Sequence, residues 1–177
     1  MKPATDPDIA LKKQLALIEE LEGQSDRAAA IVGAAWIEES LTIAIEDALA
    51  KDAKAWHRLF GPNGPLDSFS AKIDLGKLLD LMTDSIRSDL HIVRDIRNEF
   101  AHHIVHKKTL EKLSFDSMHI RDKCFALNCI AAESLAKPRM KFIRACAVLS
   151  SDFELLPLFR SPNRKDAKVS VKGEDAA

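Results

Sequence analysis

The sequence contains no tyrosine, only six glycines and seven prolines in 177 residues, and no long run of alternating β-branched and polar residues. Such runs are the usual signal for strands, so nothing in the sequence demands a β-sheet. It also lacks an excess of either charge: 26 basic and 27 acidic residues give a formal net charge of −1. Dedicated nucleic-acid-binding domains usually carry a basic excess, so strong direct DNA binding is not expected.

Cysteine is scarce as well. The three cysteines, Cys124, Cys129 and Cys146, form no C-x-x-C pair, and their number is odd. We expect them to be small core residues in a reducing compartment, not disulfides or zinc ligands. The N-terminus lacks the apolar segment of a signal peptide, and no stretch reaches the about 18 uninterrupted apolar residues of a membrane span. The sequence therefore predicts a cytoplasmic protein without a membrane partner, cofactor or metal.

The sequence is 46% hydrophobic and 30% charged, and its hydrophobic residues are enough for a single core. Helical periodicity predicts an all-α bundle of about six helices in one domain, residues 1–159, followed by a disordered tail, 160–177. The expected helix starts are Asp6 or Asp8, Ser25, Asp67 or Ser68, Thr83 to Ser85, about Asp116, and Pro138. The fifth helix is expected to run to about Ala136, and the sixth to end before Pro157.

Apolar residues at helical spacing indicate which faces of the first two helices pack against neighbours. In the first helix Leu11, Leu15, Ile18 and Leu21 repeat at helical spacing before Gly23. The second helix carries a stripe of mostly small residues that would let a neighbouring helix approach closely, and this stripe is also a candidate dimer interface. Its members are Ala30, Ala34, Ile37, Leu41, Ala44 and Ala48.

A break is expected at Phe60–Leu66, where two Gly-Pro dipeptides cannot continue a helix. The Gly-Lys-Ser/Thr ending of a phosphate-binding Walker loop is missing. Ser70 and Lys72 superficially resemble a Ser-Lys nucleophile pair, but we expect Lys72 to neutralise a nearby carboxylate or a helix end. A small-molecule or peptide site built on this loop, Lys72 and the following helix is one of three functional hypotheses.

Four of the six histidines fall between positions 91 and 106, in a segment that projects well onto a helix. One arc is apolar and should face the core; it contains Leu90, Val93, Ile96, Phe100 and Ile104. The opposite arc is a continuous polar stripe of mixed chemistry, unlike a Glu/Lys solvated face; it contains His91, Arg94, Asp95, Asn98 and His102.

Arg97 breaks this pattern, because it projects from the edge of the apolar arc. A buried guanidinium without a partner is very costly, so Arg97 must either snorkel or pair with a carboxylate. Glu38 or Glu39 on the second helix is the expected partner.

The polar stripe admits two interpretations. It could be a solvated or structural face, or it could be a binding site to which Lys72, His91, Arg94 and Asp95 contribute. In a site, His102 could act as a general acid or base, and Arg94 or Arg97 could hold a phosphate oxygen. His102, His103 and His106 crowd one helix end, but no H-E-x-x-H motif is present and a functional metal is not expected.

The run Arg97-Asn98-Glu99-Phe100-Ala101-His102 resembles the Arg-x4–6-His signature of the HEPN superfamily. Together with Phe60–Leu66, Phe69–Ile73 and Asp89–His91, in the same order, it resembles the mannitol operon repressor (MltR) family. The resemblance covers about residues 25–155. It implies an all-helical domain that dimerises and represses sugar-alcohol uptake genes.

The sequence shows no helix-turn-helix and no basic recognition helix, so such a regulator would act through a protein partner or RNA. The leading hypothesis is a dimeric, non-catalytic regulator of this kind. The wider HEPN resemblance implies the alternative, a metal-independent endoribonuclease. In it Arg97 would hold the scissile phosphate, His102 would support attack by the ribose 2′-OH, and Asn98 would orient them across a dimer cleft.

Overall fold

The computed structural model describes residues 7–103, 112–130 and 137–159, and within them all regular secondary structure is helical. The expected all-α class is confirmed, with seven helices in the described residues where about six were predicted. The expected tail, 160–177, lies outside the described residues. The helices are α1 (Pro7–Glu22), α2 (Asp26–Ala48), α3 (Ala53–Phe60), α4 (Phe69–Leu78), α5 (Asp84–His102), α6 (Met118–Phe125) and α7 (Pro138–Phe159).

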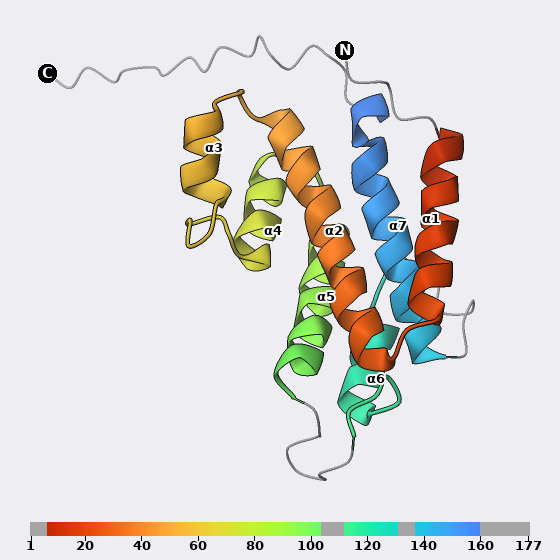
Figure 1. The fold of residues 1–177 in the computed structure, drawn as a ribbon. Helices are drawn as coiled ribbons and strands as arrows, with labels where there is room; N and C mark the ends of the chain where they lie inside the picture. Colours follow the sequence, from red (N-terminus) through yellow and green to blue (C-terminus); the bar gives the residue numbers. More distant parts are fainter. Residues whose placement is uncertain (1–6, 104–111, 131–136, 160–177) are drawn as a thin grey trace, which may run out of the picture.

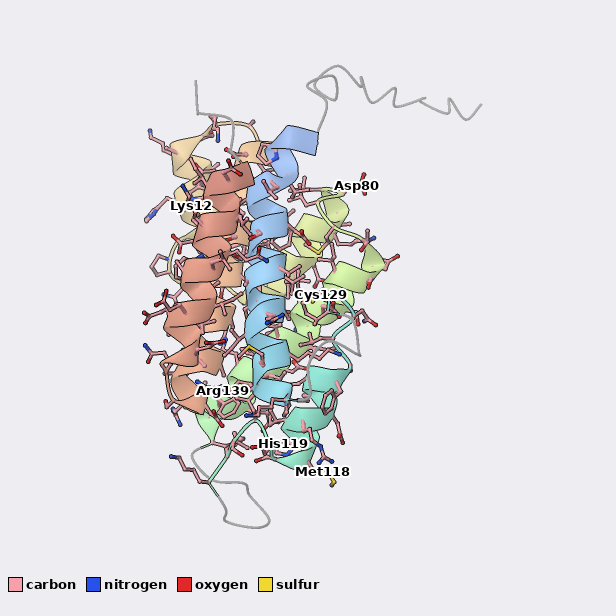
Figure 2. All side chains as sticks on the ribbon, turned by 90° about the vertical axis from the view of Figure 1, so that its right-hand side faces the viewer. Lys12, Asp80, Met118, His119, Cys129 and Arg139 are labelled. Atoms are coloured by element: carbon pink, nitrogen blue, oxygen red, sulfur yellow. The ribbon has the colours of Figure 1, made fainter. Side chains whose placement is uncertain are left out.

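Helix α2 is the central element of the bundle. In Figure 1 it crosses the molecule, with α1 and α7 on one side and α4 and α5 on the other. Helices α1 and α7 lie side by side along their lengths, which the turned view of Figure 2 shows directly. Helix α6 packs against the beginning of α7, and α3 lies at the opposite end of the molecule in Figure 1. Helices α4 and α5 also pack against each other.

The sequence of α2 explains its central place. Ser25 caps the helix, because its Oγ accepts a hydrogen bond from the Ala28 N–H. Apolar residues surround the helix, as expected for an element with neighbours on several sides. Most of the predicted small-residue stripe is confirmed in the core: Ala30, Ala34, Ile37, Leu41 and Ala44 are buried. The suggestion that this stripe is a dimer interface is wrong, because the bundle's own helices cover it.

Gly33 marks the closest approach of α2 to its neighbours. A Cβ at this position would lie 2.9 Å from the Cys146 sulfur and 3.3 Å from a Leu21 methyl carbon. Both distances are shorter than ordinary van der Waals contact. Glycine here lets α2 pack directly on α7 and α1.

By length and composition, α2 could also cross a membrane, although no uninterrupted apolar run was expected to be long enough. Half of its most apolar 18-residue window is buried inside the bundle. One such helix is weak evidence for a membrane span, because the core helix of a bundle passes the same test.

One helix was not among the predicted ones. Helix α2 ends at Ala48, the last residue of the predicted stripe, and residues 53–60 form the separate helix α3. The reason is Asp52, whose carboxylate accepts hydrogen bonds from the N–H groups of Lys54 and Ala55 and starts a new helix. Trp56 stacks on Phe60 within α3, with ring centroids 3.8 Å apart.

Two boundaries near the C-terminus also differ from the prediction. Helix α6 ends at Phe125, and residues 126–130 are not helical. Helix α7 continues through Pro157, where it was expected to stop. Pro157 lies in the last turn and is exposed, so the helix loses little more than one backbone hydrogen bond there.

The buried face of α1 differs in part from the predicted repeat. Of its four residues, Leu21 is buried and Ile18 is half-buried against the core, whereas Leu11 and Leu15 are exposed. Ala10 and Leu17 complete the buried face. The packing of α1 against α7 sets this orientation, and the spacing of leucines alone did not reveal it.

Two buried cysteines and two buried ionisable residues lie on α5, α6 and α7. Cys124 and Cys146 are fully buried, as expected of core residues, and burial raises the pKa of the Cys124 thiol to about 12. The buried Lys141 ammonium donates a hydrogen bond to the Phe125 carbonyl, 2.9 Å away at the end of α6. The Asp89 carboxylate, 1% exposed, accepts hydrogen bonds from the backbone N–H groups of Asn128 and Cys129.

Candidate functional site

Helix α5 positions most of the predicted site residues. The Thr83 hydroxyl caps it by accepting a hydrogen bond from the Ile86 N–H, and Asp84 lies in its first turn. The predicted apolar arc is confirmed as the buried face: Leu90, Val93, Ile96 and Phe100 are all at most 1% exposed. Ile104 lies outside the described residues. The remaining face of α5 carries the polar side chains.

Arg97 pairs with Glu38 of α2, as the sequence predicted. The Arg97 Nη2 lies 3.6 Å from Glu38 Oε2, and the Arg97 side chain is 31% exposed. The other Glu38 oxygen accepts a hydrogen bond from Lys72 Nζ at 2.7 Å, so the expectation that Lys72 neutralises a carboxylate is also confirmed. We call these three residues the Glu38 cluster. It joins α2, α4 and α5, and two cations share one carboxylate within it.

Arg94 is held by neighbours on α4 and α5. Its Nε and Nη2 donate to Asp95 Oδ1 at 3.1 and 2.7 Å, and its Nη1 donates to Ser70 Oγ at 2.8 Å. Further along the same helix pair, Arg87 Nη2 donates to Asp74 Oδ1 at 2.6 Å. We call these five residues the α4–α5 seam. Of the polar stripe, Arg94 therefore makes an interhelical contact with Ser70, whereas its pair with Asp95 lies within α5.

Sequence reasoning missed Ser70 and Asp74 as members of this seam. They lie four residues apart on α4, and Arg87 and Arg94 lie seven residues apart on α5. Both spacings place a pair on one helix face, so matched faces were the available signal. Ser70 and Lys72 are two residues apart and bond to different helices, so they do not form a Ser-Lys pair.

His91 belongs to the same surface, one turn before Arg94, and is half-buried. Burial lowers the pKa of His91 below its ordinary value, and the nearby Arg94 lowers it further, whereas Asp74 and Asp95 act in the opposite direction. The neutral imidazole is therefore the favoured form of His91 at pH 7.

This shift predicts a pH dependence of stability. Because the pKa of His91 is lower in the folded state, the unfolded chain takes up the proton first as the pH falls below about 6.5. Stability contributed by neutral His91 is present above that pH and is lost as the pH falls through the folded-state pKa. In urea unfolding between about pH 7.5 and pH 5, His91→Gln should lose less stability than wild type.

The control for this prediction is His57→Gln, which removes an exposed histidine on α3. It should keep the wild-type dependence of unfolding free energy on pH. Identical profiles for wild type and His91→Gln would contradict the assignment of this effect to His91.

The remaining residues of the HEPN-like motif do not converge within one chain. Asn98 is half-buried, and His102 is exposed as the last residue of α5. Arg97 and His102 are five residues apart on a continuous helix, so they project about 140° apart around its axis. Arg97 faces Glu38 on α2, whereas His102 is exposed at the end of the helix.

Hollow surfaces lie away from the predicted loop site. One pocket of about 570 Å³ lies where α2 begins and α5 ends, and one of about 360 Å³ lies between the end of α2 and α3. Among the described residues, no three His, Cys, Asp or Glu side chains come together in a way that could hold a metal ion. His106, a member of the histidine-rich helix end, lies outside them.

Comparison with known proteins adds no relative. No family model matches the chain, and no curated protein or solved structure is significantly similar to it.

Proposed function

We propose that the chain is a cytoplasmic, non-catalytic regulator like those of the mannitol operon repressor family, and that it acts as a dimer through a protein partner. The proposal takes its biological role from the resemblance of residues 25–155. The observation that carries its non-catalytic part is the Glu38 cluster. The phosphate-holding arginine of a HEPN nuclease corresponds to Arg97, which here faces a carboxylate 3.6 Å away.

The carboxylate opposes phosphate binding for two reasons. It neutralises part of the positive charge that would attract the phosphodiester, and it lies 3.6 Å from the Nη2 group that would bind a phosphate oxygen. Lys72 stabilises Glu38 from the other side at 2.7 Å, so the carboxylate is itself held in place. A substrate would have to displace a positioned counter-ion.

The α4–α5 seam supports the same proposal. Arg94 is bonded to Asp95 and Ser70, and Arg87 to Asp74, so these arginines already have partners within the chain. A basic patch that joined them to Lys107 and Lys108 would favour nucleic-acid binding, and both lysines lie outside the described residues. A polar surface with balanced charges suits a protein partner better than the backbone of a nucleic acid.

The metal-independent endoribonuclease is the second candidate, and one observation favours it. His102 is exposed and the Arg97 side chain keeps 31% of its surface, so both are accessible to a molecule that binds α5. In a dimer, His102 of one chain could meet Arg97 of the other, which would remove the obstacle of their 140° separation within one helix.

An RNA cleavage assay distinguishes the two candidates. Purified protein is incubated with total bacterial RNA and with transfer RNA in the presence of EDTA, beside the Arg97→Ala/His102→Ala double variant, after both are shown to be folded. We expect no cleavage by either protein, because Glu38 competes for Arg97. Cleavage by wild type that the double variant lacks would establish the nuclease and overturn the proposal.

The same samples test the dimer. Light scattering of the wild-type protein should give twice the chain mass of 19.6 kDa. A mass of one chain at all concentrations would contradict the dimeric part of the proposal and would also remove the cleft that the nuclease alternative needs.

A further inference from the structure

The pocket between the beginning of α2 and the end of α5 differs in charge from the rest of the polar surface. It measures about 570 Å³, within the range of about 300–1,000 Å³ typical of small-molecule sites. Arg27, His103 and Lys112 line it, with Phe100 and Leu113. We infer that this pocket binds a small organic anion, a molecule with one phosphate or carboxylate group on an apolar body.

The basic side chains of the pocket are available to bind an anion. Arg27 uses Nη2 to donate to the Ala101 carbonyl at 3.0 Å, and a guanidinium has further N–H donors. The side chains of His103 and Lys112 have no hydrogen-bond or ion-pair partner among residues 7–103, 112–130 and 137–159. By contrast, Arg87, Arg94 and Arg97 each face a carboxylate.

Among the described residues that line the pocket, the one carboxylate already has partners. Asp26 Oδ1 lies 3.3 Å from Arg139 Nε, and its Oδ2 accepts a hydrogen bond from the Phe115 N–H at 3.1 Å. Asp26 is therefore shared with Arg139, and the net charge of the described lining favours an anion. The start of α2, a helix of 23 residues, adds the partial positive charge of its dipole to the same side.

The size of the pocket sets the class of anion. Phe100 and Leu113 are its apolar lining residues, but at 1% and 5% exposure they leave little surface open to a ligand. A bare inorganic ion would leave most of the volume unused. A ring or short chain attached to the anionic group would fill it, and this is the usual division between apolar body and few polar anchors in small-molecule sites.

This inference goes beyond the proposed regulatory function and does not rest on it. It uses the pocket and not the Glu38 cluster, so a positive RNA cleavage assay would leave it intact. If the chain is a regulator, the pocket would supply its effector site.

The test is a calorimetric binding titration with four probes: phenyl phosphate, benzoate, inorganic phosphate and benzyl alcohol. Phenyl phosphate or benzoate should bind at least about tenfold more tightly than neutral benzyl alcohol, because only the charged probes reach Arg27 and Lys112. The same probe should bind more tightly than inorganic phosphate, which lacks the ring. The order of phenyl phosphate and benzoate distinguishes a phosphate from a carboxylate ligand.

Two matched variants locate the site. Arg27→Gln/Lys112→Gln removes two positive charges from the pocket, and Lys54→Gln/Arg58→Gln removes two exposed positive charges from α3 at the other end of α2 (Figure 1). The pocket variant should weaken binding of the preferred probe about tenfold, whereas the α3 variant should stay within about twofold of wild type. Lys112→Gln alone repeats the test with a minimal effect on folding, since Lys112 is exposed.

Three results would overturn the inference. They are equal weakening by the two double variants, binding of benzyl alcohol as tight as that of the charged probes, and no binding of phenyl phosphate or benzoate by the wild-type protein at about 10 mM.

Discussion

Phe100→Ala is expected to lower the free energy of unfolding by about 3–5 kcal/mol, the cost of removing a large aromatic side chain from a packed core. Phe100 is 1% exposed on the inner face of α5. Its ring lies 5.0 Å from that of Phe115, and Phe115 lies 5.1 Å from Phe142 of α7. Truncation leaves a cavity at the point where three segments of the chain meet.

The matched control is His102→Ala, two residues further along the same helix. Because His102 is exposed, its removal should change stability by no more than about 1 kcal/mol. Urea unfolding followed by circular dichroism measures both values. Large and equal losses for the two variants would show that the inner and outer faces of α5 are assigned incorrectly.

Asp89→Ala is expected to cost about 3 kcal/mol or more, because each hydrogen bond to a charged group contributes about 1.5–3 kcal/mol. The Asp89 carboxylate accepts from the Asn128 N–H at 2.9 Å, the Asn128 side-chain amide at 3.1 Å and the Cys129 N–H at 2.7 Å. Alanine leaves these donors without their acceptor in a part-buried setting. Residues 128 and 129 would then lose their attachment to α5.

Asp89→Asn keeps an acceptor oxygen and the side-chain shape, so it should cost clearly less than Asp89→Ala in the same urea titration. Glu19→Ala, which removes an exposed carboxylate from α1, should be close to neutral. The assignment fails if Asp89→Ala is no more destabilising than Glu19→Ala.

Helix α5 was the most predictable part of the molecule. Its apolar residues repeat at helical spacing over several turns, so the buried arc could be assigned from sequence and is confirmed by the burial of Leu90, Val93 and Ile96. The partner of Arg97 was predictable for an energetic reason, because a guanidinium beside the core requires a carboxylate. Glu38 provides it.

The α4–α5 seam could not be predicted in the same way. Its bonds, such as Arg94 to Ser70, join helices whose relative rotation is fixed by the core and not by the polar residues themselves. The prediction for α1 was wrong in part for a related reason. The predicted repeat joined Leu11 and Leu15 to Leu21, but contact with α7 buries Leu17 beside Leu21 and leaves the other two leucines exposed.

The short helix α3 and the end of α7 show the limits of local signals. Asp52 begins a helix that was not among the predicted ones, and Pro157 does not end a helix where a stop was expected. In both places the helix boundary depends on the effect of a single residue. Boundaries of this kind depend on a few hydrogen bonds, whereas the existence of a helix depends on many.

The side-by-side arrangement of α1 and α7 has a consequence for synthesis of the chain. Helix α1 makes most of its interhelical contacts with α7, and Lys13 of the first helix bonds to Glu154 of the last at 3.1 Å. During translation, α1 and much of α2 emerge long before the helix that covers their apolar surfaces. Closing the core thus brings together the first and last helices of the described residues, so the nascent N-terminal helices stay exposed to chaperones until α7 has been synthesised.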